Sequence, residues 1–283
     1  MFERFAASFA LARSSWQVLR LDKQLVIFPV LSGLGCLLVL LSFAVPFIAQ
    51  PQWLDFLDNA NGVQPPPWVY AVLFAYYFCN YFVIIFCNAA LISCALIRFN
   101  GGTPTLADGF GAAASRLPQI LAWALVSATV GVLLKVIESV NEKAGAVVSW
   151  LLGTAWTVIT YFVVPVLVVE KVGPFEAIQR SVAILRKTWG EALVGRMGIG
   201  FFVFLLLLPG IALAVVGVLL LLAVPVAGIA VLLLTGVYFL VWMAVGSALN
   251  GIFLSALYQY AANGEVPSGF DRSTMEHAFE PKS

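Results

Sequence analysis

Long apolar stretches alternate with short polar connections along this chain. Six of the stretches reach the ~20 residues that a helix needs to cross a hydrocarbon core of ~30 Å at ~1.5 Å per residue. Continuous apolar stretches predict membrane helices, because the strands of a membrane barrel would alternate in polarity. We therefore expect an all-α polytopic membrane protein with about six transmembrane helices, at residues 25–49, 68–97, 120–136, 144–169, 197–222 and 226–258.

Composition agrees with this fold class. Of the 283 residues, 62% are apolar and only 10% are charged, and the mean hydropathy is +1.00. A soluble domain carries about 25% charged residues. The chain is therefore not an ordinary soluble domain, and the length of residues 25–49 predicts an uncleaved first span rather than a signal peptide.

Positive charge is concentrated in alternate connections. The connections in between contain only two cations, Lys135 and Lys143, and the connection at residues 50–66 contains none. Because basic connections stay in the cytoplasm, we expect both termini there, in a cell membrane. The remaining cations are Arg4, Arg13, Arg20, Lys23, Arg98, Arg116, Lys171, Arg180, Arg186, Lys187, Arg196, Arg272 and Lys282.

An amphipathic pattern occupies residues 175–189. Its apolar positions follow spacings of three and four, and Pro174 suits a first helical turn. This pattern predicts a surface helix in the headgroup plane with cations toward anionic lipid. The apolar positions are Phe175, Ile178, Val182, Leu185 and Trp189, and the lipid-headgroup candidates are Arg13, Arg180, Arg186 and Lys187.

The pattern is repeated. Residues 2–16 align with 175–189 without a gap and match at Phe2, Glu3, Ser8, Ala10, Arg13 and Trp16. A weaker copy lies at 98–118, and the tail with Pro267 and Phe270 resembles a fourth. We expect three units of surface helix plus membrane hairpin, at 1–97, 98–170 and 171–260, and a cytoplasmic tail at 261–283. Such repeats frame a central site in many membrane proteins. The alternative is that the duplication only builds a helix bundle here.

Polar but uncharged side chains lie inside the spans, whose central portions hold no charge. Such side chains hold helices together or line a water-filled path. Pro209 and Gly210 predict a break in the fifth span, and broken helices frame transport sites as well as packing kinks. The polar lining candidates are Asn80, Asn88, Thr154, Thr157, Ser247 and Asn250.

Little in the sequence predicts catalysis. The chain has one histidine, His277, and no phosphate-binding glycine loop, HExxH or GxSxG motif. Lys135 and Glu138, at the outer end of the third span, are spaced to pair on one helix face. We expect no metal, no cofactor and no enzyme, and we interpret the four cysteines as packing residues.

Three segments carry a resemblance. Residues 28–33 (FPVLSG), 160–181 (TYFVVPVLVVEKVGPFEAIQRS) and 256–279 (ALYQYAANGEVPSGFDRSTMEHAF) resemble an uncharacterised family of bacterial six-helix membrane proteins, classed as a domain of unknown function. The middle segment also resembles the membrane domains fused to glycerophosphodiester phosphodiesterases, where it forms an interfacial helix without catalytic residues. The resemblance implies the fold, the orientation and a bacterial inner membrane, but no active site.

Two functional hypotheses follow. The first is passive transport or permeation of a small ion, solute or lipid past the polar lining residues, by a homo-oligomer. The alternative is a membrane-organising scaffold that binds lipid or a protein partner through the surface helices. We expect membrane lipids as partners and no nucleic acid.

Overall fold

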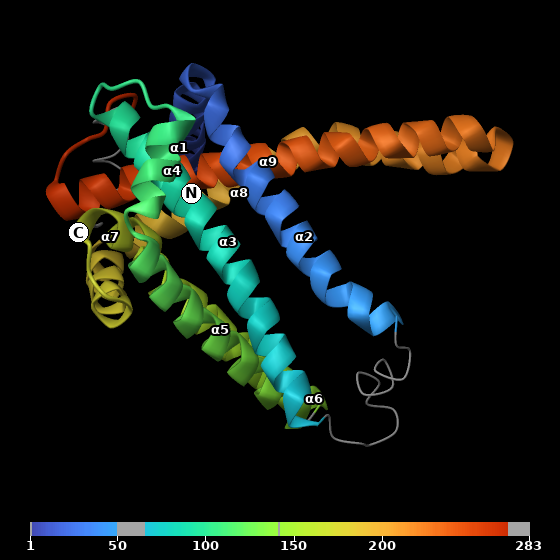
Figure 1. Cartoon of the computed structure of the whole chain (residues 1–283). Helices are drawn as coiled ribbons and strands as arrows, with labels where there is room; N and C mark the ends of the chain where they lie inside the picture. The colour runs from blue at the N-terminus through green and yellow to red at the C-terminus, as the bar shows by residue number, and fades with distance from the viewer. Residues whose placement is uncertain (1, 50–65, 141, 271–283) are drawn as a thin grey trace. The chain divides into compact units, whose positions relative to one another are not determined.

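The computed structural model describes residues 2–49, 66–140 and 142–270. Within these ranges all regular secondary structure is helical, and six helices are long and apolar enough to cross a membrane. The predicted all-α fold with six candidate spans is therefore confirmed (Figure 1). The helices are α1 (Phe2–Leu21), η1 (Lys23–Val26), α2 (Ile27–Ala49), α3 (Pro67–Phe99), α4 (Leu106–Ala114), α5 (Leu117–Val140), α6 (Glu142–Ile159), α7 (Val163–Glu170), α8 (Pro174–Ala223) and α9 (Pro225–Asn263).

The fourth predicted stretch is divided between α6 and α7. The Ser181 hydroxyl donates to the Ile159 carbonyl at 2.7 Å and accepts from the Phe162 N–H at 3.0 Å, so it satisfies backbone groups at the break. Pro165 lies in the first turn of α7, where its missing N–H leaves no bond unmade.

The chain divides into two compact units. Unit 1 comprises Met1–Pro29, Cys94–Leu106 and Arg186–Ser283, and unit 2 comprises Val30–Ser93 and Ala107–Leu185. These units cut across the three sequence repeats, whose division of the chain stays a prediction.

Small residues set the packing of unit 2. A side chain at Gly131 would lie 3.5 Å from the Tyr81 ring, and one at Gly153 would lie 3.6 Å from Leu134. Trp123 of α5 stacks on Trp156 of α6 with ring centroids 5.6 Å apart. Close approach through small residues is typical of membrane helices, which lack a hydrophobic drive to associate in lipid.

In unit 1, α1 and η1 pack against α9. The α8 and α9 helices run antiparallel beside each other (Figure 1), with Gly210 against Tyr238 and Gly217 against Leu232. We call this part of α8 and α9, residues 201–243, the hairpin. The side chains that form the core of the unit include Leu11, Val18, Leu25, Leu249, Ile252 and Leu257.

A polar contact joins the end of α3 to the start of η1. Arg98 forms an ion pair with Asp22, whose side chain is 5% exposed, and the Arg98 Nη2 donates to Asp22 Oδ1 at 2.5 Å. The Ser268 hydroxyl donates to the Phe99 carbonyl at 2.8 Å, and the Phe270 ring meets Phe99 edge-on. The residues after α9 therefore close the polar end of unit 1.

Candidate functional site

The surroundings of α9 change abruptly at Met243. Before this residue the large apolar side chains are exposed, with Leu240 at 68% and Met243 at 63%. After it α9 has no exposed large apolar side chain, and Leu249 and Ile252 are completely buried. One continuous helix thus has an exposed apolar part, residues 225–243, and a buried part, residues 244–259.

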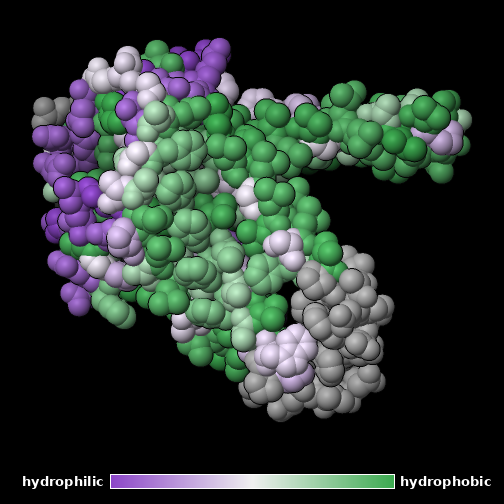
Figure 2. All heavy atoms as spheres, in the orientation of Figure 1, coloured by the Kyte–Doolittle hydropathy of each residue, from purple (hydrophilic) through white to green (hydrophobic). Residues whose placement is uncertain are grey.

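The exposed part has the length of a bilayer core. At ~1.5 Å per residue, residues 201–222 of α8 and 225–243 of α9 each extend about 30 Å, which matches the ~30 Å hydrocarbon thickness. The whole of α9, with 39 residues, would extend about 58 Å. The hairpin is apolar over nearly its entire visible face (Figure 2). Within α8 and α9, the hairpin therefore has the length and the exposed apolar surface of a membrane-crossing segment, and residues 244–263 of α9 extend past it.

An aromatic cluster marks the base of the hairpin. The Trp16 ring lies 6.0 Å from Phe202 and 6.2 Å from Trp242, and Arg20 lies over Trp16 with its Cζ 5.6 Å from the ring centroid. Tryptophan with a neighbouring cation is typical of the membrane–water interface. The cluster thus lies at the position where exposed apolar side chains end.

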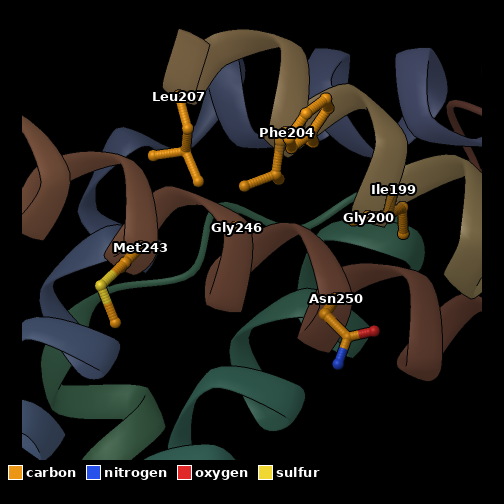
Figure 3. Close-up of a pocket in the computed structure, with 8 residues that line it drawn as sticks. Ile199, Gly200, Phe204, Leu207, Met243, Gly246 and Asn250 are labelled. Carbon is orange, nitrogen blue, oxygen red and sulfur yellow. The ribbon is translucent and has the colours of Figure 1, made fainter. Parts of the chain in front are cut away.

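A groove opens beside this cluster, between α8 and α9. Its volume is about 410 Å³. Leu207, Phe204 and Ile199 lie along α8, and Met243, Gly246 and Asn250 lie along the antiparallel α9 (Figure 3). Gly200 and Val203 complete the lining, in which Asn250 supplies the polar side chain.

Two glycines shape the groove in different ways. A side chain at Gly246 would lie 3.1 Å from Val203, so this glycine permits the two helices to approach closely. Gly200 has no atom within 4 Å of the position that its Cβ would take, so the space beside it is open. The groove therefore forms where α8 and α9 pack closely at Gly246 and where Gly200 leaves the space beside it unfilled.

The predicted break at Pro209 and Gly210 is wrong. The α8 helix continues through both residues, and its non-helical backbone lies at Thr188 (φ −124°, ψ 20°). Gly210 instead provides contact, because a Cβ there would lie 2.7 Å from the Tyr238 ring. In the same turn the Tyr238 hydroxyl donates to the Leu206 carbonyl at 2.5 Å. Packing across the hairpin thus holds the helix straight despite the missing proline N–H.

The polar lining candidates have different surroundings. Thr154 and Thr157 are exposed, and each hydroxyl donates at 2.8 Å to the carbonyl four residues earlier in its own helix. The Asn80 amide does the same toward Tyr76 at 2.9 Å, and Asn88 is half-buried. These four residues belong to unit 2. Within that unit, three of the four polar groups bond to their own helix rather than across a path.

Ser247 and Asn250 belong to the buried part of α9. Ser247 itself is exposed, whereas Asn250 is half-buried and lines the groove. The sequence placed both inside the sixth span, but the exposed apolar surface of α9 ends at Met243. Asn250 is thus a polar candidate that the structure places in the lining of a groove.

The cationic candidates lie on two helices that share a burial pattern. In the alignment of 2–16 with 175–189, the buried residues of α1 correspond to buried residues of α8, and Arg13 corresponds to Arg186, with both exposed. Lys187 is also exposed, whereas Arg180 forms an ion pair with Glu170 at 2.9 Å. The buried pairs are Leu11 with Ile184, Ala12 with Leu185, and Ser15 with Thr188.

The face that the second surface helix buries in the protein lies about one position from the predicted apolar stripe, which was assigned to the membrane surface. Ala177, Ser181 and Ile184 are buried, and Phe175 of the stripe is 74% exposed. Ser181 is buried because it bonds to the backbone at the α6–α7 break. The predicted pair of Lys135 and Glu138 is confirmed, at 2.8 Å.

Sequence reasoning missed the groove itself. Trp16 was identified only as a repeat identity. Nothing in the sequence indicates that Trp16 meets Trp242, because the contact joins helices more than 200 residues apart. Among the residues that the structure describes, no group of three or more His, Cys, Asp or Glu side chains could hold a metal ion. The expectations of no cofactor and no catalysis stay predictions.

One family model matches residues 68–270, and it is described as a family of unknown function (DUF6159). No curated protein matches the chain. The match covers five of the six candidate spans and the whole of both groove helices. The six apolar helices indicate a multi-pass membrane protein.

Proposed function

The chain belongs to DUF6159, a family of unknown function, and we propose that it is a non-enzymatic membrane-organising protein that binds anionic lipid through its surface helices. This is the scaffold hypothesis of the two that the sequence raised. It assigns the lipid contact to the cytoplasmic side, to which the charge distribution in the sequence assigns both surface helices.

The burial pattern shared by the two aligned helices carries this proposal. Each helix buries one face in the protein and leaves Arg13 or Arg186 exposed at the same aligned position. Lys187 adds a second exposed cation, and the structure records no ion pair for these three side chains in the part of the chain that it describes. A cation near an anionic leaflet contributes about 1 kcal/mol of attraction.

Lipid analysis tests this proposal. Protein extracted into polymer nanodiscs retains neighbouring lipid, and we expect anionic lipid to be enriched over the bulk membrane. The triple variant Arg13→Gln, Arg186→Gln and Lys187→Gln should reduce this enrichment about threefold or more, because three attractions of about 1 kcal/mol are lost in part. Lys135→Gln is the matched control, since Lys135 is an exposed cation on the predicted outer side. Equal enrichment in wild type and triple variant would reject the proposal.

Permeation is the second candidate, and the position of Asn250 in an open groove favours it. Three of the four unit 2 candidates bond to their own helices, which argues for the scaffold. The same preparation in liposomes separates the two roles. If the liposomes pass an ion or small solute and Asn88→Leu abolishes this flux, permeation is the function and the scaffold proposal is rejected. A protein captured with the chain in stoichiometric amount in mild detergent would instead identify the partner of a scaffold.

A further inference from the structure

We propose that the groove between α8 and α9 binds one phospholipid, with an acyl chain along Leu207 and Met243 and the polar headgroup at the Asn250 amide. This inference rests on the proposed lipid-binding function and names a specific site for it. It concerns the uncharged groove, whereas the scaffold proposal concerns exposed cations.

Depth is the first argument for a lipid. Met243 is the last exposed apolar residue of α9, and the adjacent Trp242 belongs to the aromatic cluster that marks the interface. Asn250 lies seven residues further along the helix, or about 10 Å toward the headgroups at ~1.5 Å per residue. The interfacial layer on each side of the hydrocarbon is about 5–8 Å thick, so Asn250 lies at its outer side, with the headgroups. The groove therefore extends from the acyl chains to the headgroup layer.

The lining provides the second argument. Leu207 and Met243 lie at one end of the groove, Phe204 lies between the ends, and Asn250 lies at the other end with Ile199 (Figure 3). An amide NH₂ donates two hydrogen bonds, and the phosphate oxygens of a phospholipid headgroup are acceptors at this depth. The volume of about 410 Å³ lies within the range of small-molecule sites, ~300–1,000 Å³. The lining thus changes from apolar to polar in the same direction as a phospholipid does.

The aromatic cluster next to the groove residues along α8 and α9 carries a cation that suits a phosphate headgroup. Arg20 is exposed and lies over Trp16, which contacts Trp242 and Phe202, the chain neighbours of the groove residues Met243 and Val203. No charged side chain lines the groove itself. A ligand with an uncharged apolar part and an anionic headgroup fits this arrangement, and a phospholipid has that chemistry.

Gly200 allows a direct test, because its missing side chain leaves the groove open. Gly200→Leu should fill the groove without a clash, since nothing lies within 4 Å of the Cβ position. Gly236→Leu is the matched control: Gly236 is also exposed, helical and without neighbours, but it does not line the groove. Both proteins should fold, which circular dichroism and size-exclusion chromatography would check.

Native mass spectrometry of protein purified in mild detergent gives the readout. We expect wild type and Gly236→Leu to retain one phospholipid at collision energies that remove the detergent, and Gly200→Leu to lose it at least tenfold. Asn250→Leu should reduce retention about threefold to tenfold, the effect of one hydrogen bond, while Ser247→Leu, a neighbouring exposed position, should not. A photoactivated acyl chain should crosslink to Phe204 or Met243.

Each other outcome overturns the inference. Wild type without retained lipid, or equal retention in Gly200→Leu and Gly236→Leu, would show that the groove binds none. A wild-type dimer that Gly200→Leu dissociates would show that a second copy occupies the groove. Groove variants should leave the anionic enrichment in nanodiscs unchanged, so wild-type protein that shows normal enrichment but retains no lipid would reject this site alone. Wild-type protein that retains the phospholipid in native mass spectrometry but shows no enrichment of anionic lipid in nanodiscs would reject only the scaffold proposal.

Discussion

The two parts of α9 are both mainly apolar but have opposite surroundings, and the second part is the more polar, with Ser247, Asn250, Ser255 and Gln259 against Thr235 in the first. Residues 225–243 expose most of their large side chains, and residues 244–259 bury most of theirs, with Leu240 at 68% exposure and Leu249 at 0%. In the first part the apolar side chains suit a lipid environment, and in the second they suit a protein core packed with α1 and η1. Apolar sequence therefore indicates burial from water but does not distinguish lipid from protein as the surrounding medium.

Truncation of a leucine in each part is expected to produce the largest difference. Leu249→Ala should lower the free energy of unfolding by about 2–5 kcal/mol, because it leaves a cavity in the core of unit 1. Leu240→Ala should change it by only about 0.5 kcal/mol, because lipid or detergent fills the space. Reversible unfolding in mixed micelles or bicelles measures both. Similar losses at the two positions would show that both parts of α9 have the same surroundings.

A smaller effect is expected where the exposed part contacts α8. Gly210→Ala should destabilise the protein by about 1–3 kcal/mol, because the new Cβ would lie 2.7 Å from the Tyr238 ring. Gly236→Ala, with no atom within 4 Å, should be neutral or stabilise by about 0.5–1 kcal/mol through helix propensity. The same unfolding assay compares them. If Gly210→Ala is as stable as its control, contact between the two helices does not hold the hairpin together.

The smallest effect should come from the bond across the hairpin. Tyr238→Phe removes the hydroxyl that donates to the Leu206 carbonyl and should cost about 0.6 kcal/mol, the average for such bonds between membrane helices. Thr235→Val is a suitable comparison, because the Thr235 hydroxyl bonds only within its own helix, to the Val231 carbonyl at 2.8 Å. Equal stability of Tyr238→Phe and wild type would show that this bond contributes nothing to hairpin stability.

Most of the secondary structure could be predicted from hydropathy alone. The length and continuity of the apolar stretches identified all six candidate spans. The repeat of residues 2–16 at 175–189 also identified two helices whose aligned positions share burial, including the exposed Arg13 and Arg186. These predictions succeeded because they depend on local periodicity and on the free energy of transfer out of water.

The candidate site was predicted less completely. Asn250 was identified because a polar side chain in an apolar stretch is conspicuous, but the same criterion selected Thr154 and Thr157, whose hydroxyls bond to their own helix. Pro209 indicated a break that the hairpin packing removes. A polar or helix-breaking residue identifies a position of interest, and only its neighbours determine its role.

The sequence by itself determined that this chain is helical, where its candidate membrane helices lie, and which surface helices repeat. This was possible because, in a lipid environment, an apolar stretch of this length satisfies the hydrogen bonds of its backbone N–H and C=O groups by forming a helix. The tertiary structure decided where α9 passes from an exposed surface into a core, why Gly210 faces Tyr238, and that Gly200 and Asn250 share a groove. These arrangements depend on contacts between distant segments, and local apolar pattern does not encode which neighbour a side chain meets.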